Sequence, residues 1–531
     1  MAADELSPYI LLLPLLALPL VVALLARRRA LGRDDARLPP GPWAMPVIGH
    51  LHHVAGDAPP HRALRDLSRT YGPLMALRLR TVPVVVASSP AAAREVTGTH
   101  DAAFASRPAA PALRLLTGGA EGVTFAPYGD AWRRMRRACA AGLFSAPRVR
   151  SFRAVREDEL GRLLRAVAAA ASAPAPAPVN LTRRMSRFAF DSSARAVAGS
   201  RSEHRDEVLR ALQDALKTLP KLSLLDFFPS SRLAALASHV PRVVARRRAA
   251  MRPIGPGLDA VVDSIVLEHL ERRDSDVDDD EDLLDLLLRM QKDVDSQYPF
   301  TTLNIKSVIM PSSTHTHTQD LFVAGGETSA TAMQWAMTEL IRNPRAMRKA
   351  QAEVRSALAG QSTVTEAGLT DLHYLRLVIK ETLRLHPPAP VLLRECLSAR
   401  EVLGYHVPRG AMVLVNAWAI GRDPAHWDAP EEFAPERFQE LDGARDDFRG
   451  AADFEYVPFG AGRRMCPGAA LGLAHVELAL AALLFHFDWE MPEGMVAEEM
   501  DVTEAAGITM PPRSELLLVA IPRVPVPVPV D

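Results

Sequence analysis

The chain has 531 residues, of which 48% are hydrophobic and 24% charged, so it can bury a large core. Its formal net charge of −1 gives no bulk reason to expect nucleic acid as a partner. The cysteines, Cys139, Cys396 and Cys466, form an odd and sparse set, which argues against a disulfide framework and for a body that faces the cytosol.

An uncharged apolar run at residues 8–26 opens the chain and has about the length that spans a bilayer. Asp4 and Glu5 precede the run and Arg27 follows it, which favours a retained anchor with a lumenal N-terminus over a cleaved signal peptide. We therefore expect lumenal residues and a transmembrane anchor at 1–26, a basic and Pro-rich connector at 27–46, and one cytosolic catalytic domain at 47–531.

The elements that follow predict a mainly α-helical domain with small β-sheets. Residues 73–89 have the pattern of two short strands in a hairpin. From about residue 90 to 390 most segments have helical periodicity, and strand-like sequences return at 404–416 and 514–522. The Val-Pro tail after Arg523 cannot pair as a central strand, because alternate residues lack an N–H.

The strongest local signal is FGAGRRMCPG at residues 459–468. Met465 stands where a phosphate-cradling loop would need its third glycine, so the dinucleotide fingerprint fails. A lone cysteine is most simply a buried small hydrophobe. Here Cys466 lies between glycines, which let a backbone pass close to a flat ligand. Arg464 is expected to lower the thiol pKa and to meet an anionic group.

The complete loop matches the pattern Phe-x-x-Gly-x-Arg-x-Cys-x-Gly and resembles the haem-binding loop of the cytochrome P450 family. In that family a cysteine thiolate is the axial ligand of the haem iron. The resemblance implies that heme b is bound through Cys466 as the metal ligand. It also implies that Phe459, Gly462, Arg464 and Gly468 of this loop contact the cofactor.

Two further matches concern pairs of residues on predicted helices. KETLRLHPP places Glu381 and Arg384 at i and i+3, which alone is most simply a surface salt bridge. With Arg437 of APERF, the resemblance implies a structural Glu-Arg-Arg network. WRRMR places Trp132 and Arg136 at i and i+4, and the resemblance implies that this pair binds a haem propionate, a carboxylate that suits a guanidinium.

The segment AGGETS, residues 324–329, places two glycines in an apolar helical sequence, at a cost of about 1 kcal/mol each relative to alanine. Close packing of two helices is the structural explanation. Beside a haem, the resemblance implies another: Gly325 and its neighbour leave space for dioxygen, Thr328 holds a water or the oxygen, and Glu327 delivers protons. Glu327 and Thr328 are the predicted catalytic residues.

The resemblance covers about residues 38–520, and PPGP, AGGET and PERF are similar to the large plant microsomal group that oxidises specialised metabolites. It implies a monooxygenase of the endoplasmic reticulum membrane that inserts one atom of dioxygen into a small hydrophobic metabolite, terpenoid-like first and phenylpropanoid-like second. By analogy, the substrate pocket includes Gly325, Val391 and Ile508, within largely apolar segments at 105–125, 222–230, 389–393 and 505–509.

No flavin or nicotinamide motif is visible, so the resemblance implies a separate membrane-bound reductase that supplies electrons from NADPH. Three basic side chains next to Trp132 are either a docking surface for this reductase or a solvated helix face; they are Arg133, Arg134 and Arg137. Both explanations remain open at this point.

The tract PSSTHTHTQ, residues 311–319, interrupts this pattern. His315 and His317 do not share a helical face, and no nearby cysteine or carboxylate completes a metal site. Without the tract, NIKSVIM joins DLFVAGGETSA and gives an uninterrupted helix, so we expect an insertion, whether a genuine one or translated intron sequence. Pro311 and the Ser/Thr run favour a break or a bulged loop.

Two alternative functions follow. One is a membrane-tethered haem-binding protein that the insertion at 311–319 has made inactive. The other is a haem-thiolate enzyme that rearranges a hydroperoxide without dioxygen or reductase. Such enzymes tend to lack an acid-alcohol pair, which this chain retains in Glu327 and Thr328.

Overall fold

The structure is a computed structural model that describes residues 38–108, 123–172, 178–198, 288 and 320–527, apart from residues 47, 55, 57, 80–81, 141–143, 442–453, 506 and 508. Several predicted features lie outside these residues: the anchor at 1–26, most of the connector, segments 109–122 and 222–230, the tract 311–319 with its two histidines, and Ile508.

The described part of the chain is mainly α-helical. The longer helices are α3 (Pro60–Tyr71), α6 (Asp130–Ala138), α8 (Arg153–Ala171), α9 (Leu181–Ala198), α17 (Asp320–Arg342), α18 (Pro344–Ala357), α19 (His373–Leu385) and α22 (Ala469–His486). The shorter ones are α2 (Leu51–Val54), α4 (Pro90–Arg94), α7 (Ala146–Ser151), α20 (Ala417–Ile420), α21 (Arg437–Leu441), the π-helix η2 (Glu95–Thr99) and the 3₁₀ helices η3 (Asp101–Phe104), η6 (Glu366–Leu369), η8 (Gly462–Arg464) and η9 (Ala497–Glu499). Proline begins α3, α4 and α18, where its missing N–H costs no helical hydrogen bond.

The strands form small sheets, as the sequence predicts. One sheet has the order β1-β2-β7-β4, with β1 (Leu74–Leu79), β2 (Val82–Ala87), β4 (Val391–Glu395) and β7 (Met412–Asn416). A second has the order β3-β9-β8, with β3 (Val179–Asn180), β8 (Phe487–Glu490) and β9 (Leu517–Pro522), and the third pairs β5 (Arg400–Val402) with β6 (Tyr405–Val407). The predicted hairpin at 73–89 is confirmed, because β1 and β2 pair antiparallel. Residues 523–527 carry no strand, in agreement with the prediction for the Val-Pro tail.

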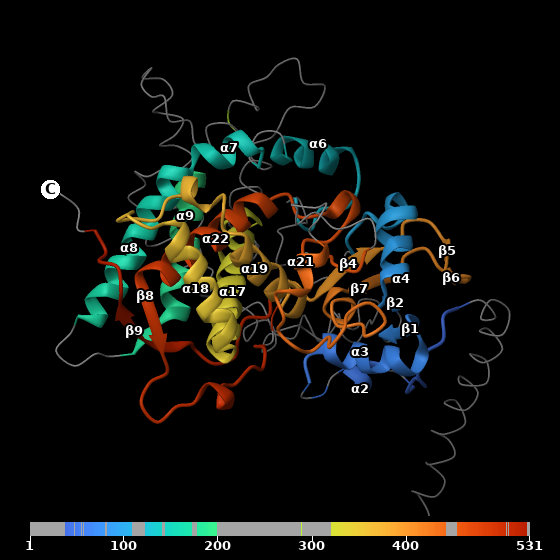
Figure 1. The fold of residues 1–531 in the computed structure, drawn as a ribbon. Coiled ribbons are helices and arrows are strands. Elements are labelled where there is room, and N and C mark those ends of the chain that lie inside the picture. The colour runs from blue at the N-terminus through green and yellow to red at the C-terminus, as the bar shows by residue number, and fades with distance from the viewer. Residues whose placement is uncertain are drawn as a thin grey trace, which may run out of the picture.

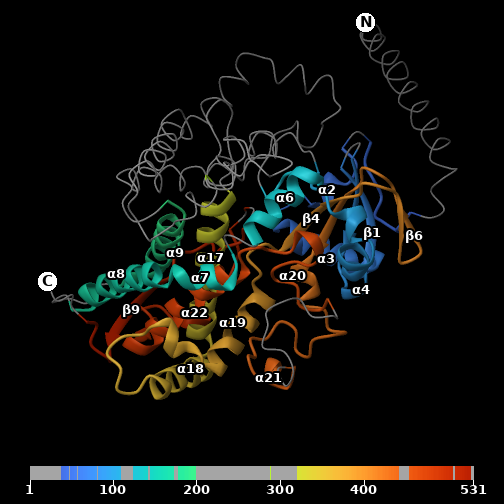
Figure 2. The same ribbon diagram turned by 90° about the horizontal axis from the view of Figure 1, so that it is seen from above.

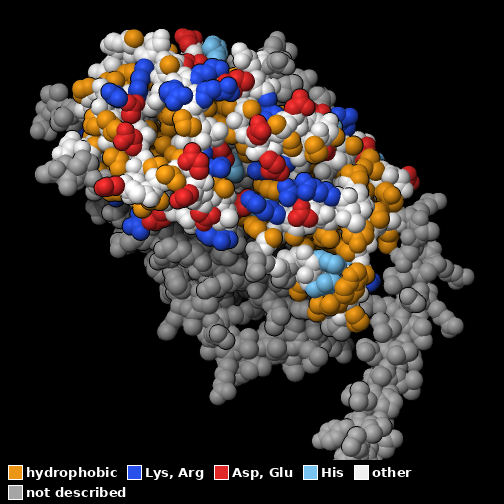
Figure 3. Space-filling model, turned by 60° about the horizontal axis from the view of Figure 1, so that its bottom comes forward, with side chains coloured by type: hydrophobic (Ala, Val, Ile, Leu, Met, Phe, Trp, Pro, Cys, Tyr) orange, Lys and Arg blue, Asp and Glu red, His pale blue; other side chains and the backbone are white. Residues whose placement is uncertain are grey.

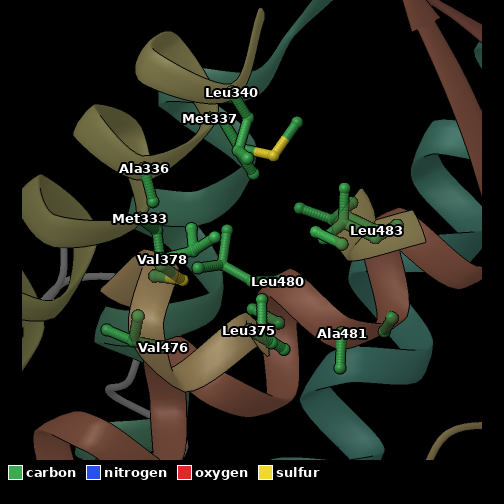
Figure 4. Packing of buried hydrophobic residues seen from close by; sticks show 14 of the residues in the cluster. Met333, Ala336, Met337, Leu340, Leu375, Val378, Val476, Leu480, Ala481 and Leu483 are labelled. Carbon is green, nitrogen blue, oxygen red and sulfur yellow. The ribbon is translucent and has the colours of Figure 1, made fainter. Parts of the chain in front are cut away.

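Most of the long helices, namely α8, α9, α17, α18, α19 and α22, gather on one side of the molecule. The largest sheet lies on the other, with α3 and α4 beside it (Figures 1 and 2). The helical core forms where α17, α19 and α22 meet: Met333 and Met337 of α17 lie against Val378 of α19 and Leu480 of α22 (Figure 4). Helix α22 is long and apolar enough to cross a membrane. Its residues 478–484 are fully buried in the protein, as expected for a core helix.

Charged side chains of both signs are interspersed over the face shown in Figure 3. One carboxylate, Glu504, is instead buried, with 3% of its surface exposed. It accepts a hydrogen bond from Arg62 of α3 at 2.9 Å and lies 3.5 Å from His61. Burial alone would raise the pKa of Glu504, but hydrogen bonds from His61 and Arg62 lower it to about 2. This contact ties the segment after η9 to α3.

Candidate active site

The cysteine loop joins η8 to α22. The backbone N–H of Cys466 donates to the carbonyl of Phe459 at 2.9 Å, which closes the loop at its base. The Phe459 side chain packs against the helical core. Gly468 is the N-cap of α22, and a Cβ at this position would lie 3.4 Å from Cε1 of Phe144. The loop is therefore held by the core on one side and by Phe144 on the other.

A close approach to η2 and η3 fixes the other half of the loop. Gly462 has φ +67°, and a Cβ there would lie 2.2 Å from the carbonyl oxygen of Thr97. Glycine is required for both reasons. The buried carboxylate of Asp101 accepts from the Arg463 backbone N–H at 3.0 Å and from its guanidinium at 2.8 Å. Gly462 was predicted to contact the flat cofactor, whereas it lies against the backbone of Thr97.

The Cys466 side chain retains exposed surface, yet desolvation by the protein around it raises the pKa of the thiol. The Gly468 backbone and the charge of Arg136 lower this pKa only in part. The expectation that Arg464 lowers the thiol pKa is therefore wrong, because the charge that acts on the sulfur is that of Arg136 and burial outweighs it. A coordinated metal ion deprotonates a thiol outright, so iron could hold this sulfur as a thiolate.

The predicted propionate-binding pair lies beside the loop on α6. Arg136 is partly buried and donates to the carbonyl of Met465, next to Cys466. The indole N–H of Trp132 donates to the carbonyl of Val123 at 2.8 Å. The guanidinium of Arg464 lies 4.0 Å from the Trp132 ring centroid and also donates to backbone carbonyls. Arg136 thus flanks the sulfur, while Trp132 supports Arg464.

A further buried residue that was not predicted as part of the site is Arg394, in the LLRE stretch of β4. Its side chain is 1% exposed, and its Nε has no hydrogen-bond partner among the described residues. Burial holds its pKa well below the usual value, and the charges of Arg107 and Arg464 lower it further, with Asp101 opposing. A buried cation is costly unless an anion meets it. This cluster fits the propionates of a haem, and the unpartnered Nε is the structural signal for it.

The predicted Glu-Arg-Arg network is assembled at the C-terminal end of α19. Glu381 and Arg384 are both buried and form two hydrogen bonds of 2.8 Å. Arg437 of α21 donates to the same carboxylate at 2.9 Å. Three carbonyls accept the remaining Arg384 N–H groups: those of Gly421, Pro430 and Glu432. The structure thus brings together three residues that the sequence places up to 56 positions apart.

The predicted catalytic pair lies on α17. Burial raises the pKa of Glu327, and a hydrogen bond from Thr509 to its Oε1, at 3.3 Å, lowers it in part. The Thr328 hydroxyl donates to the carbonyl of Ala324 in its own helix. At the next residue, Ser329, α17 meets the first turn of α22, because a Cβ on Gly472 would lie 3.5 Å from Ser329 Oγ. The acid-alcohol pair is therefore near the helix that follows Cys466.

The two glycines of AGGETS face α9. A Cβ on Gly326 would lie 2.5 Å from Cδ1 of Phe190, and a Cβ on Gly325 would lie 3.2 Å from Ser193 Oγ. Close helix packing, the structural explanation considered above, accounts for both positions. Direct contact of Gly325 with substrate stays a prediction.

Two segments predicted to line the substrate pocket, 389–393 and 505–509, are joined by the residues that flank them. Val391 begins β4, and three residues before it the carbonyl of Pro388 accepts from the Met510 backbone N–H at 3.1 Å. The carbonyl of Met510 accepts from the indole of Trp335 on α17 at 2.8 Å. The third predicted pocket residue, Ile508, lies outside the described residues.

Known proteins resemble the chain over nearly its full length. A sequence model of the family described as "Cytochrome P450" matches residues 39–519. Desmethyl-deoxy-podophyllotoxin synthase of Sinopodophyllum hexandrum is 41% identical, over 95% of this chain and 95% of that protein. Ent-cassadiene hydroxylase of Oryza sativa subsp. japonica is 44% identical, over 89% of each. A zebrafish cytochrome P450 structure with abiraterone superposes with a TM-score of 0.69 at 24% identity, covering 88% of this chain and 99% of that one.

The solved structure shows the same fold, mainly helical with small sheets. The family match and the two plant relatives go further, since they extend over the cysteine loop and the α17 motif alike. The chain belongs to the cytochrome P450 family. It is a cytochrome P450 monooxygenase, similar to plant enzymes that oxidise specialised metabolites.

Proposed function

We propose that the enzyme inserts one atom of dioxygen into a small, largely apolar specialised metabolite, and that the thiolate of Cys466 would hold the iron of heme b. The observation that carries the proposal is the position of Cys466. The residue retains exposed surface although the protein around it desolvates its thiol, Arg136 lies next to it, and the helix that follows it meets α17. Bound haem supplies dioxygen activation, and the other steps below belong to the chain.

The buried arginine cluster would hold the cofactor's carboxylates. Arg394 offers an Nε that has no partner in the part of the chain that the structure describes, and Arg464 and Arg107 lie close enough for their charges to lower its pKa. Guanidinium groups suit carboxylates because they present several N–H donors in a fixed plane. The Glu381–Arg384–Arg437 network would keep the polypeptide around the site in place, since it joins α19, α21 and three loop carbonyls.

Glu327 would donate protons, and Thr328 would hold a water molecule. Because burial raises the Glu327 pKa, its carboxyl is protonated to a larger extent than an exposed glutamate at neutral pH and can donate a proton. The balanced reaction uses a C–H substrate, dioxygen, two electrons and two protons. One oxygen atom becomes the product hydroxyl and the other leaves as water.

We favour a terpenoid-like substrate, with a phenylpropanoid-like one next. The rice relative is named a hydroxylase of ent-cassadiene, and the Sinopodophyllum relative a synthase of desmethyl-deoxy-podophyllotoxin. Both names denote oxidation or assembly of specialised metabolites, and the second keeps the phenylpropanoid alternative open. The names of both relatives also favour turnover over an inert haem-binding role.

The electrons would come from NADPH through a separate reductase at the endoplasmic reticulum membrane, as is typical of the family. Arg133 and Arg137 on α6 are exposed, on the same helix as Arg136, and suit an acidic docking surface. The proposed anchor at 1–26 and connector at 27–46 would hold the catalytic domain, 47–531, at the cytosolic face.

Co-expression with a plant NADPH-dependent reductase, in a host that supplies terpene scaffolds beginning with ent-cassadiene, tests the function. Hydroxylated product that requires NADPH and dioxygen is the expected result. Cys466→Ala should abolish haem binding and the reduced carbon monoxide band of thiolate-ligated haem. Haem retained with an unchanged spectrum would refute the ligand assignment.

Glu327→Gln separates the catalytic role from cofactor binding. The amide keeps the shape of the side chain but cannot donate a carboxyl proton, so NADPH should be consumed with less product and more hydrogen peroxide. The haem spectrum should not change. Product formation equal to that of the wild type would exclude Glu327 as the proton donor.

A further inference from the structure

Glu327, the proposed proton donor on α17, is contacted by the hydroxyl of Thr509, which belongs to another segment of the chain. Thr509 lies on the segment between η9 and β9, and its Oγ1 donates to Oε1 of Glu327 at 3.3 Å. The two residues are 182 positions apart in the sequence. A glutamate side chain has three rotatable bonds, so a fixed donor that binds one carboxylate oxygen restricts where its proton can point.

The residue after Thr509 is held rigidly to the same helix. The Met510 carbonyl accepts from the Trp335 indole at 2.8 Å, and its N–H donates to the Pro388 carbonyl at 3.1 Å. The segment therefore touches α17 at residues 327 and 335, about two helical turns apart. A threonine hydroxyl has only one rotatable bond from the backbone, so anchoring Met510 also places the Thr509 hydroxyl.

Trp335 is itself locked in position. Its ring is fully buried and stacks on His386 with 3.9 Å between centroids and 6° between planes. His386 follows α19, and its Nε2 lies 2.8 Å from Oε1 of Glu339, one turn beyond Trp335 on α17. The stack and this hydrogen bond join α17, the end of α19 and the Met510 segment into one frame.

We propose that Thr509 is a positioning residue for proton delivery: its hydroxyl, fixed by the frame around Trp335 and Met510, orients the Glu327 carboxyl during turnover. The inference rests on the proposed role of Glu327. Glu327 gives up its carboxyl proton and takes a replacement from solvent. When delivery fails, the same two electrons and two protons leave with both oxygen atoms as hydrogen peroxide, and the substrate stays unoxidised.

The test compares Thr509→Val, which keeps the side-chain shape without the donor, with Thr509→Ser, which keeps the hydroxyl. Thr503→Val is the matched control, because the Thr503 hydroxyl binds the exposed Asp501 at 2.6 Å. Product and hydrogen peroxide per NADPH are measured on the full-chain holoenzyme with reductase and ent-cassadiene, or the terpene scaffold found by co-expression. Thr509→Val should lower product per NADPH about two- to tenfold, the range for one hydrogen bond. Thr509→Ser and the control should match the wild type.

Infrared spectroscopy gives a readout that does not depend on turnover. The difference between wild type and Glu327→Gln isolates the carbonyl stretch of the protonated Glu327 carboxyl. Loss of the Thr509 donor should move this band to higher wavenumber, and Thr509→Ser should restore it. An unmoved band in Thr509→Val would overturn the proposal, even if that variant were poorly expressed or inactive.

A double variant distinguishes failure of the proposed Glu327 role from failure of the proposed Thr509 role. If Thr509 acts through Glu327, adding Thr509→Val to Glu327→Gln should not reduce coupling further. A full additional loss would show that Thr509 acts by another route and would overturn the inference alone. Wild-type coupling in Glu327→Gln would overturn the proposed proton donor and the inference with it. Wild-type coupling in Thr509→Val, with Glu327→Gln impaired, would refute only the positioning role.

Discussion

Replacing Arg384 by alanine should destabilise the protein more than replacing an exposed arginine by alanine. The side chains of Arg384 and Glu381 are both 0% exposed. Alanine removes two hydrogen bonds to Glu381 and takes the Arg384 donor from the carbonyls of Gly421, Pro430 and Glu432, of which Glu432 retains Arg437 at 3.3 Å. The Glu381 carboxylate stays buried, with Arg437 at 2.9 Å as its remaining charged partner.

Removing one partner of a buried ion pair costs about 3–5 kcal/mol. The entropy of unfolding is about 2.1 cal/mol/K per residue, so the 39–519 region should have about 1 kcal/mol/K in total. We therefore expect Arg384→Ala to lower the Tm by about 3–5 °C. Arg437→Ala should have a smaller effect, because that side chain is 11% exposed and donates only one hydrogen bond to Glu381.

Differential scanning fluorimetry of the holoenzyme at a fixed scan rate measures the change, and the haem-to-protein ratio is recorded in parallel. Arg345→Ala is the matched control, because Arg345 is 85% exposed and lies 3.9 Å from Glu436. The control should shift the Tm by less than about 1 °C. A Tm of Arg384→Ala within the range of this control would refute a stabilising network at the end of α19.

Two further predictions concern packing and pH. Gly326→Ala should lower the free energy of unfolding by up to about 2 kcal/mol, because overpacking against Phe190 outweighs the gain in helix propensity. Gly325→Ala should leave the free energy of unfolding nearly unchanged. If urea unfolding showed the same loss for both variants, the packing explanation for Gly326 would be contradicted. The pKa of Glu504 is about 2 in the folded protein and about 4.3 when unfolded. Its ionised carboxylate therefore contributes in full to the free energy of unfolding above pH 5, and this contribution is lost as the pH falls toward 2. Over that range the free energy of unfolding of the wild type should fall by about 3 kcal/mol more than that of Glu504→Gln. An equal fall in both proteins would show that the Arg62 contact contributes nothing to stability.

Site residues that belong to a short local motif could be predicted from the sequence. Cys466 and its glycines stand within ten residues, and Glu381 and Arg384 are one helical turn apart. Arg437 came only through the family resemblance, because nothing local links it to Glu381. The structure then supplied the hydrogen bonds that join all three side chains.

Contacts between side chains that are far apart in the sequence could not be predicted from local motifs. Arg464 is two residues from Cys466 and was expected to act on the thiol, but its guanidinium stacks on Trp132. Arg136, far away in sequence, is the charge that acts on the sulfur. Arg394 carries no local motif that separates it from a surface arginine, and only its burial beside other arginines reveals the cluster.

The sequence by itself determined the family, the mainly helical fold with small sheets, the cysteine loop and the acid-alcohol pair, because each depends on residue type at short, fixed spacing. The tertiary structure decided which charges meet and what each glycine faces. It turned Gly326 toward Phe190 and placed Thr509 on Glu327. Such contacts join segments far apart in the chain, so their geometry depends on how α9, α17 and the C-terminal segment pack against one another.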